Sequence, residues 1–373
     1  MILGIDVSSY FEEIAAGAKY YRGDKEVDFF NEFKNNGVDY IRIRLWVDPY
    51  SNDGKHSPYL GGTNDLDSFI NLSRIATAHG FKVLLDIHYS DFWCDPSKQT
   101  LPKSWANKNN KELNEAVYKY TKKVLETAKE NNIDITLIQI GNEITNGMLW
   151  PNGRLIDQKD GTRTNYETVC GFLNSGIKAV KEVSPNSKII IHLEKSFDNK
   201  IYNEYCENLV KYHVDYDILG VSYYPYWHHN FKDLFVNLDD IKAKFHKPIM
   251  IVETGYAFTL ESYFKKTNKD SEKMLIDERF LSQMETKLEY PLSVEGQKDF
   301  IKELISLSKK HSIEGIFYWE PCWLPLEGIC WSSEAGLTYI HEEQKTTRNE
   351  WANQCLFDYE GKMLPAFDEF RNK

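Results

Sequence analysis

The sequence predicts a single (β/α)8 barrel, and three observations support that prediction. Eight short apolar runs recur along the 373 residues, amphipathic helical patterns lie between them, and no low-complexity or Pro-rich linker divides the chain. Near-continuous apolar strands are typical of parallel sheets that are covered on both faces. The count of eight favours a closed barrel over an open doubly wound sheet. We therefore expect one domain over residues 1–373, with long loops at the carboxyl ends of the strands.

The expected elements follow one another in a regular order. The predicted strands are rich in Ile, Leu, Val and aromatic residues and cover 2–9, 38–47, 81–89, 135–143, 188–194, 217–224, 248–255 and 314–320. The first helical pattern places Phe29, Phe30 and Phe33 on one face and ends at Gly37. The next has Asn64 or Asp65 as its N-cap and ends at Gly80. Later helical patterns cover 112–132 and 294–312, and long irregular regions cover 145–165, 255–293 and 320–350.

Composition and charge exclude several classes of function. The formal net charge of −11 argues against nucleic acid or an anionic membrane as the main partner. No run of eighteen apolar residues is present, so no segment is expected to span a membrane. Aromatic residues make up 14% of the chain, which is typical of grooves that hold ring-shaped ligands. We expect a monomer with free thiols, although a bridge between Cys322 and Cys330 stays open because both lie in one predicted loop.

The amino-terminal residues bear on localisation. The start "MILGIDVSSY" runs directly into a predicted strand, so no signal peptide is expected in this chain. The protein is then secreted if a leader was removed and cytoplasmic otherwise.

Polar residues collect at the ends of the predicted strands. Arg42 and Arg44 alternate with apolar residues, so both arginines fall on one face and must meet carboxylates if that face is inside the barrel. Glu143 and Glu253 end the fourth and seventh strands, which face each other across a barrel mouth. Two carboxylates on either side of one bond are what glycosidic hydrolysis requires. The alternative is that each Glu only balances an arginine.

Other chemistries have weaker signals. Asp86, His88, Asp91 and Asp95 lie close in sequence, yet neither HExxH nor a calcium loop of EF-hand spacing occurs. We therefore expect no catalytic metal. The chain also lacks a GxGxxG motif after the first strand, a P-loop and a GxSxG elbow, which argues against dinucleotide, nucleoside triphosphate and serine-hydrolase chemistry.

Six motifs together resemble one known family over nearly the whole chain. They are "IRIRLWVDP", "LLDIHYSDFWCDPSKQTLPKSW", "IQIGNEITNGMLWP", "GVSYYPYW", "IVETGY" and "FYWEPCW". These motifs resemble glycoside hydrolase family 53, the arabinogalactan endo-β-1,4-galactanases of clan A. The resemblance implies a retaining, endo-acting enzyme that cleaves β-1,4-linked galactose in pectic galactan, type I arabinogalactan or galacto-oligosaccharides.

The resemblance also implies roles for single residues. Glu143 matches the acid/base and Glu253 the nucleophile. By the same resemblance, Asn142 should hold the sugar's 2-hydroxyl, and Arg44 should keep Glu253 ionised and oriented. A nucleophile also needs a depressed pKa, and a positive charge beside Glu253 would lower its pKa. The remaining expected substrate-binding residues line the top of the barrel or its subsites: His88, Asp91, Trp93, Tyr223 and Trp319.

The sequence departs from the family pattern in one loop, and two other functions stay open. Some bacterial members of the family hold a structural calcium in the loop after the seventh strand, but the loop "AFTLESYFKKTNKDSEKMLIDERF" lacks their run of Asp, His and Asn, so we expect no cofactor. A clan A enzyme acting on mannan or glucan would share the barrel-top residues, and a barrel that only binds carbohydrate is a further alternative.

Overall fold

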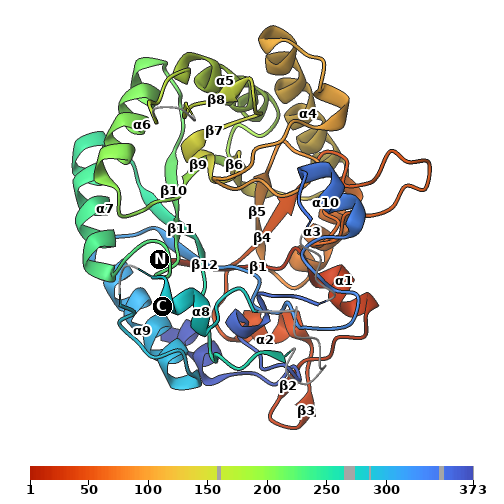
Figure 1. The fold of residues 1–373 in the computed structure, drawn as a ribbon, viewed down its shortest axis with the longest axis vertical. Coiled ribbons are helices and arrows are strands. Elements are labelled where there is room, and N and C mark those ends of the chain that lie inside the picture. Colours follow the sequence, from red (N-terminus) through yellow and green to blue (C-terminus); the bar gives the residue numbers. More distant parts are fainter. Residues whose placement is uncertain (158–160, 264–273, 285–286, 344–347, 373) are drawn as a thin grey trace.

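The chain folds into a closed barrel of eight parallel strands surrounded by helices (Figure 1). The computed structural model describes residues 1–157, 161–263, 274–284, 287–343 and 348–372. Around the barrel the strand order is β1-β12-β11-β10-β9-β6-β5-β4. In chain order the barrel strands are β1 (Ile2–Asp6), β4 (Tyr40–Leu45), β5 (Lys82–Ile87), β6 (Ile135–Ile140), β9 (Lys188–Leu193), β10 (Ile218–Tyr223), β11 (Ile249–Thr254) and β12 (Gly315–Tyr318). All eight predicted strands are confirmed.

The helices cover the outside of the barrel. They are α1 (Tyr10–Ala15), α2 (Phe29–Asn35), α3 (Leu66–Ala78), α4 (Asn110–Glu130), α5 (Tyr166–Val183), α6 (Asn199–Lys211), α7 (Phe231–Phe245), α8 (Glu278–Ser282), α9 (Val294–Lys310) and α10 (Glu334–Ile340). Short antiparallel pairs, β2 (Tyr21–Arg22) with β3 (Lys25–Glu26) and β7 (Gly147–Met148) with β8 (Gly153–Arg154), lie in the connections. Single 3-10 turns are found at Lys103–Trp105, Ile144–Asn146 and Ala352–Gln354, with a longer one at Pro365–Asn372.

Local sequence signals explain where the helices begin. The side chain of Asp65 accepts a hydrogen bond from Ser68 N, which makes Asp65 and not Asn64 the N-cap of α3. Asn109 and Glu112 form a capping box at the start of α4. Phe29, Phe30 and Phe33 are all buried on the inner face of α2, as their spacing predicts.

The interior of the barrel changes from apolar to polar along the strands. Near the amino ends a small cluster fills the barrel: Tyr40, Leu84, Leu137, Ile190, Ile218, Met250, Val252 and Phe317. Two residues further along the same faces, β4 presents Arg42 and β5 presents Asp86. The outward residues of β4, including Ile41 and Ile43, pack instead in the large core between barrel and helices. The polar side chains therefore collect at the carboxyl ends of the strands, inside the barrel.

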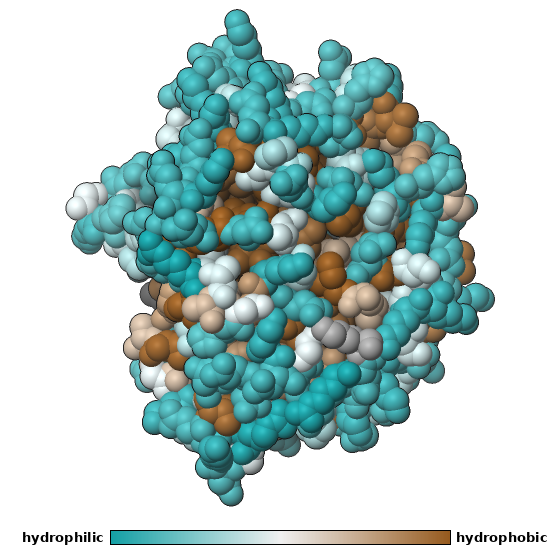
Figure 2. All heavy atoms as spheres, turned by 180° about the vertical axis from the view of Figure 1, so that it is seen from behind, coloured by the Kyte–Doolittle hydropathy of each residue, from teal (hydrophilic) through white to brown (hydrophobic). Residues whose placement is uncertain are grey.

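The face of the molecule in Figure 2 is mostly hydrophilic, with hydrophobic residues visible near its centre and at several places toward its edge. Among the described residues, no helix is both long and apolar enough to cross a bilayer. All six cysteines are buried and none of them forms a disulfide, so the bridge between Cys322 and Cys330 that the sequence left open is absent.

Candidate active site

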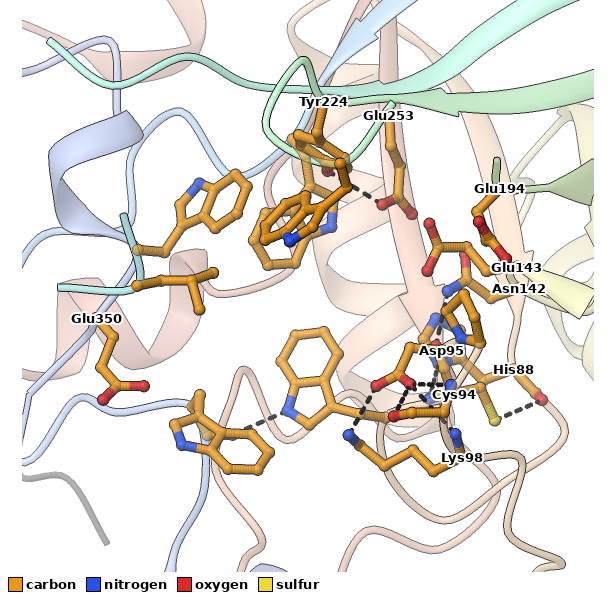
Figure 3. A pocket seen from close by; sticks show the side chains of 18 of the residues that line it. His88, Cys94, Asp95, Lys98, Asn142, Glu143, Glu194, Tyr224, Glu253 and Glu350 are labelled. Carbon is orange, nitrogen blue, oxygen red and sulfur yellow. Dashed lines mark hydrogen bonds and ion pairs between the residues drawn. The ribbon is translucent and has the colours of Figure 1, made fainter. Parts of the chain in front are cut away.

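A cavity of about 760 Å³ lies at the carboxyl ends of the barrel strands. Five carboxylates line it, those of Asp95, Glu143, Glu194, Glu253 and Glu350. Its walls are strongly aromatic and include the six tryptophans Trp93, Trp227, Trp319, Trp323, Trp331 and Trp351. Figure 3 shows the carboxyl groups of Glu143 and Glu253 pointing toward one another, with Glu194 beside Glu143. The expectation that strand-end carboxylates meet in an aromatic groove is therefore confirmed in its geometry.

A left-handed turn at the end of β6 directs Glu143 into the cavity. Gly141 has a φ of 83°, and a Cβ there would lie 2.8 Å from the side chain of Ile144, so the position requires glycine. Glu143 itself has a φ of 47° and a ψ of 49°, a conformation that is costly for a residue with a Cβ. Such backbone strain is concentrated at functional sites.

Arg42 is the centre of a buried network beneath the cavity. Its Nη1 lies 2.8 Å from Asp6, and its Nη2 lies 2.8 Å from Asp86 and 2.7 Å from Glu253 Oε1. The same Nη2 donates to Asn142 Oδ1 at 3.0 Å. The guanidinium is 1% exposed, so its charge interacts with these carboxylates with little screening by water. Arg42 therefore orients both Glu253 and the amide next to Glu143.

The expectation that Arg44 holds Glu253 is wrong. Arg44 pairs with Glu320 and with Asp6, and its Nη2 donates to Gly61 O at 2.6 Å. Its guanidinium lies 4.2 Å from the ring centroid of Trp93, a cavity-lining residue. Arg44 therefore supports the aromatic wall from behind. The parallel register sets Arg44 opposite Asp86 on β5 and one layer further toward the rim than Arg42.

Glu253 ends β11 in a partly compensated environment. Burial raises the pKa of Glu253 to about 7, and the neighbouring charge of Arg42 opposes that increase. Tyr224 donates its hydroxyl proton to Glu253 Oε2 at 3.1 Å, which also favours the ionised form (Figure 3). The expected depressed pKa is therefore wrong, because desolvation outweighs the ion pair.

Among the described residues, no cationic side chain forms an ion pair with Glu143. Burial raises the pKa of Glu143 well above its usual range, and the nearby charge of Glu253 raises it further. Its Oε1 shares a hydrogen bond of 2.5 Å with Ser222 Oγ on β10. Of the two carboxyls, Glu253 beside Arg42 is therefore the one that ionises first, and Glu143 is the one that keeps a proton.

Asn142 and His88 are fixed by their neighbours. Asn142 Nδ2 donates to Cys94 O at 2.8 Å. His88 Nδ1 accepts hydrogen bonds from Trp46 Nε1 and Cys94 N, each at 3.2 Å, so its Nε2 carries the proton toward Asp86 Oδ2 at 3.0 Å. Both residues line the cavity, as do the expected Trp93 and Trp319.

Two expected site residues lie elsewhere. Tyr223 faces outward, stacks near Phe231 and Phe300, and donates its hydroxyl to His229 O at 3.2 Å. Its neighbour Tyr224 takes the place in the cavity, because Gly220 and Ser222 set the inward face of β10. Asp91 is fully buried outside the cavity, where it binds Lys103 Nζ at 2.9 Å.

Sequence reasoning missed four residues that shape the site. They are Tyr224, Glu194, Ser222 and His192, all of which follow or end β9 and β10. Alternation along "GVSYY" was a usable signal for Ser222 and Tyr224. Likewise, "KIIIHLE" ends a predicted strand with a histidine and a carboxylate.

No geometry for a metal ion is evident in the part of the chain that the structure describes, where no group of three His, Cys, Asp or Glu side chains could hold one. Asp86 and His88, which suggested a metal from their spacing, are engaged with each other and with Arg42. The loop considered for calcium lies partly in 264–273, outside the described residues.

Comparisons with known proteins identify the family of the chain. The chain is 33% identical to an endo-β-1,4-galactanase of Bacillus subtilis, over 99% of this chain and 85% of the relative. It is similar to the solved catalytic domain of a family 53 protein from Ignisphaera aggregans, with a TM-score of 0.87, 38% identity, and coverage of 99% of this chain and 95% of that one. A solved fungal β-1,4-galactanase gives a TM-score of 0.76 and 26% identity over 100% of this chain and 99% of that one. The model for glycosyl hydrolase family 53 matches residues 2–370, and the chain belongs to that family.

Proposed function

We propose that this protein is a retaining endo-β-1,4-galactanase, with Glu143 as acid/base and Glu253 as nucleophile. The observation that carries the proposal is the asymmetry of two facing carboxyls in a family 53 barrel. Arg42 lies 2.7 Å from Glu253, whereas the part of the chain that the structure describes offers Glu143 the Ser222 hydroxyl and other acids but no paired cation. Its relatives include proteins named as endo-β-1,4-galactanases.

The asymmetry fits a double displacement. In the first step, Glu143 gives its proton to the glycosidic oxygen while Glu253 attacks the anomeric carbon and forms a glycosyl ester. In the second step, the ionised Glu143 takes a proton from water as the water attacks that carbon and releases Glu253. A nucleophile beside a cation and a proton donor without one have the protonation states that this sequence requires at its start.

Asn142 and the tryptophans would hold the sugar. Asn142 Nδ2 has two N–H groups, one of which serves Cys94 O, and the other would donate to the 2-hydroxyl at the cleavage point. The apolar face of a galactose ring can stack on Trp93 or Trp319.

The test is a panel of linear β-1,4-galactan, β-1,4-mannan and β-1,4-glucan, with the anomeric configuration of early products read by NMR. We expect galactan to be cleaved at internal bonds, and the new reducing ends to have the β configuration. Hydrolysis of mannan or glucan without galactan would overturn the substrate, and α-configured products would overturn the retaining mechanism. The roles are separated by Glu253→Ala, whose activity azide should restore, and Glu143→Ala, which should mainly slow substrates with poor leaving groups. The reverse pattern would mean that the two roles are exchanged.

A further inference from the structure

A continuous row of hydrogen-bonded side chains connects the two catalytic carboxyls, and two of its members, His192 and Ser222, have no role in the mechanism above. It runs from Glu253 through Arg42, Asn142, His192 and Ser222 to Glu143. His192 Nδ1 lies 3.0 Å from Asn142 Oδ1, and His192 Nε2 lies 2.8 Å from Ser222 Oγ. Ser222 Oγ lies 2.5 Å from Glu143 Oε1. His192 and Ser222 are fully buried, so their polar hydrogens must form hydrogen bonds with these neighbouring side chains.

The orientation of the Asn142 amide is fixed from two sides. Arg42 has only donors and lies 3.0 Å from Oδ1, so that atom must be the oxygen. On the other side, Cys94 O can only accept and lies 2.8 Å from Nδ2, so that atom must be the nitrogen. Rotation of the amide would place donor against donor and acceptor against acceptor.

The fixed amide determines the tautomer of His192. Because Asn142 Oδ1 can only accept, the ring nitrogen 3.0 Å away must carry the proton. The backbone N–H of Glu143 also points at Nδ1, but at 3.4 Å it is the longer and weaker contact. Burial lowers the pKa of His192 well below its usual range, and the charge of Arg42 lowers it further, so the ring is neutral. Its Nε2 therefore has a lone pair, and Ser222 must donate to it.

Ser222 has one hydroxyl proton, which it donates in the hydrogen bond to His192 Nε2. The short contact between Ser222 and Glu143 then needs a proton from the carboxyl group. We propose that His192 and Ser222 are positioning residues whose hydrogen-bond direction, set by Asn142, favours the protonated form of Glu143. This inference rests on the proposed role of Glu143 as proton donor.

These hydrogen bonds between Asn142, His192, Ser222 and Glu143, called the relay below, affect both steps of the double displacement. When Glu143 gives its proton to the leaving oxygen, the Ser222 hydroxyl turns from His192 to the new carboxylate. His192 Nε2 is then left without a donor in a buried site, which disfavours that state. The same preference draws a proton back to Glu143 when water attacks, so the relay favours return to the starting form.

Several titratable or charged groups also face this row of hydrogen-bonded side chains. Those around Glu143 are Glu253, Glu194, Asp95, Tyr202 and Tyr224. Those around His192 are Arg42, His88 and His228. None of them fixes the direction of the Ser222 hydrogen bond, so the tautomer of His192 is a separate observable.

The direct test is nitrogen-15 NMR on the unaltered, histidine-labelled chain, with His192 assigned from the signals lost in His192→Phe. We expect the tautomer with the proton on Nδ1. A proton on Nε2 would overturn the proposal, because Ser222 would then be free to donate to an ionised Glu143. This measurement needs no substrate, so it tests the relay even if the protein proves not to cleave galactan.

The kinetic test uses the basic limb of the pH profile of kcat/KM on linear galactan. In His192→Phe, Ser222 no longer has a second acceptor and can donate to ionised Glu143, so the limb should move to lower pH by about one unit. In a Ser222→Ala background the same His192→Phe change should move it no further. A shift to higher pH, or an equal shift in both backgrounds, would mean that His192 does not act through Ser222.

Discussion

Replacing Arg42 by lysine should move the ionisation of the nucleophile. Arg42 Nη2 lies 2.7 Å from Glu253 Oε1, while its other contacts hold Asp6 and Asp86. At an effective dielectric constant of ~20, a unit charge at ~4 Å stabilises a carboxylate by roughly 4 kcal/mol, and at ~7 Å by roughly 2.4 kcal/mol. A lysine side chain is shorter than arginine, and its ammonium group cannot reach all three acids. We therefore use the ~7 Å separation for its distance from Glu253. The difference corresponds to a rise of about one unit in the pKa of Glu253.

The assay is the pH dependence of kcat/KM on linear galactan. The nucleophile must be ionised, so a raised pKa of Glu253 should move the acidic limb upward by about one unit and lower the rate below that limb about tenfold. Arg44→Lys is the matched control, since Arg44 pairs with Glu320 and Asp6, and its acidic limb should stay in place. Thermal melts at the assay pH confirm that both variants are folded. A limb that moves in Arg44→Lys and stays in Arg42→Lys would refute the assignment of the ion pair.

Three further predictions concern neighbouring groups. Tyr224→Phe removes the hydroxyl 3.1 Å from Glu253 and should raise the acidic limb by roughly half a unit to one unit, while Tyr223→Phe, which faces outward, should leave the pH profile unchanged; equal profiles for both would contradict the placement of Tyr224. Burial raises the pKa of Glu194 from 4.5 to about 7, so the folded state binds the extra proton, and its stability is complete below pH 4.5 and is lost as pH rises through 7. At pH 8, Glu194→Gln should therefore have a higher melting temperature than the unaltered protein, with a free energy of unfolding larger by up to ~3 kcal/mol. At pH 4 the two proteins should melt at the same temperature. A melting temperature unchanged at pH 8 would show that Glu194 is not desolvated as described. All six cysteines are buried and none forms a disulfide, so a thiol reagent should label six groups in denaturant and almost none in the native protein, and fewer than six in denaturant would indicate a disulfide.

Periodic features of the sequence predicted the fold correctly, and they placed Glu143 and Glu253 at the carboxyl ends of strands, where both side chains line the cavity. Both depend on local information: apolar runs mark the strands, and a polar residue at the end of a parallel strand must lie at the carboxyl edge of the barrel. The need of buried arginines for carboxylates was also predictable, and both Arg42 and Arg44 are paired with acids.

Pairings across the barrel could not be predicted in the same way. Which acid meets Arg42 depends on how far each strand is staggered against the next, and no single strand encodes that stagger. The family resemblance indicates Tyr223, but its neighbour Tyr224 lines the cavity, and the inward position of Ser222 decides which of the two faces inward. Asp91 lies in a loop, and a loop residue's direction depends on contacts such as the ion pair with Lys103.

The left-handed backbone at Glu143 also bears on how such a protein can be stabilised. A residue with a Cβ at a φ of 47° costs about 1–2 kcal/mol relative to the right-handed form. The carboxyl of Glu143 is also buried with no cation paired to it among the described residues. Replacing Glu143 by glycine removes both costs together with the proton donor. An inactive variant should thus tolerate more heat than the active enzyme. A laboratory selection for thermal resistance alone would enrich such inactive forms, so any stabilised library of this barrel has to be screened for cleavage in every round.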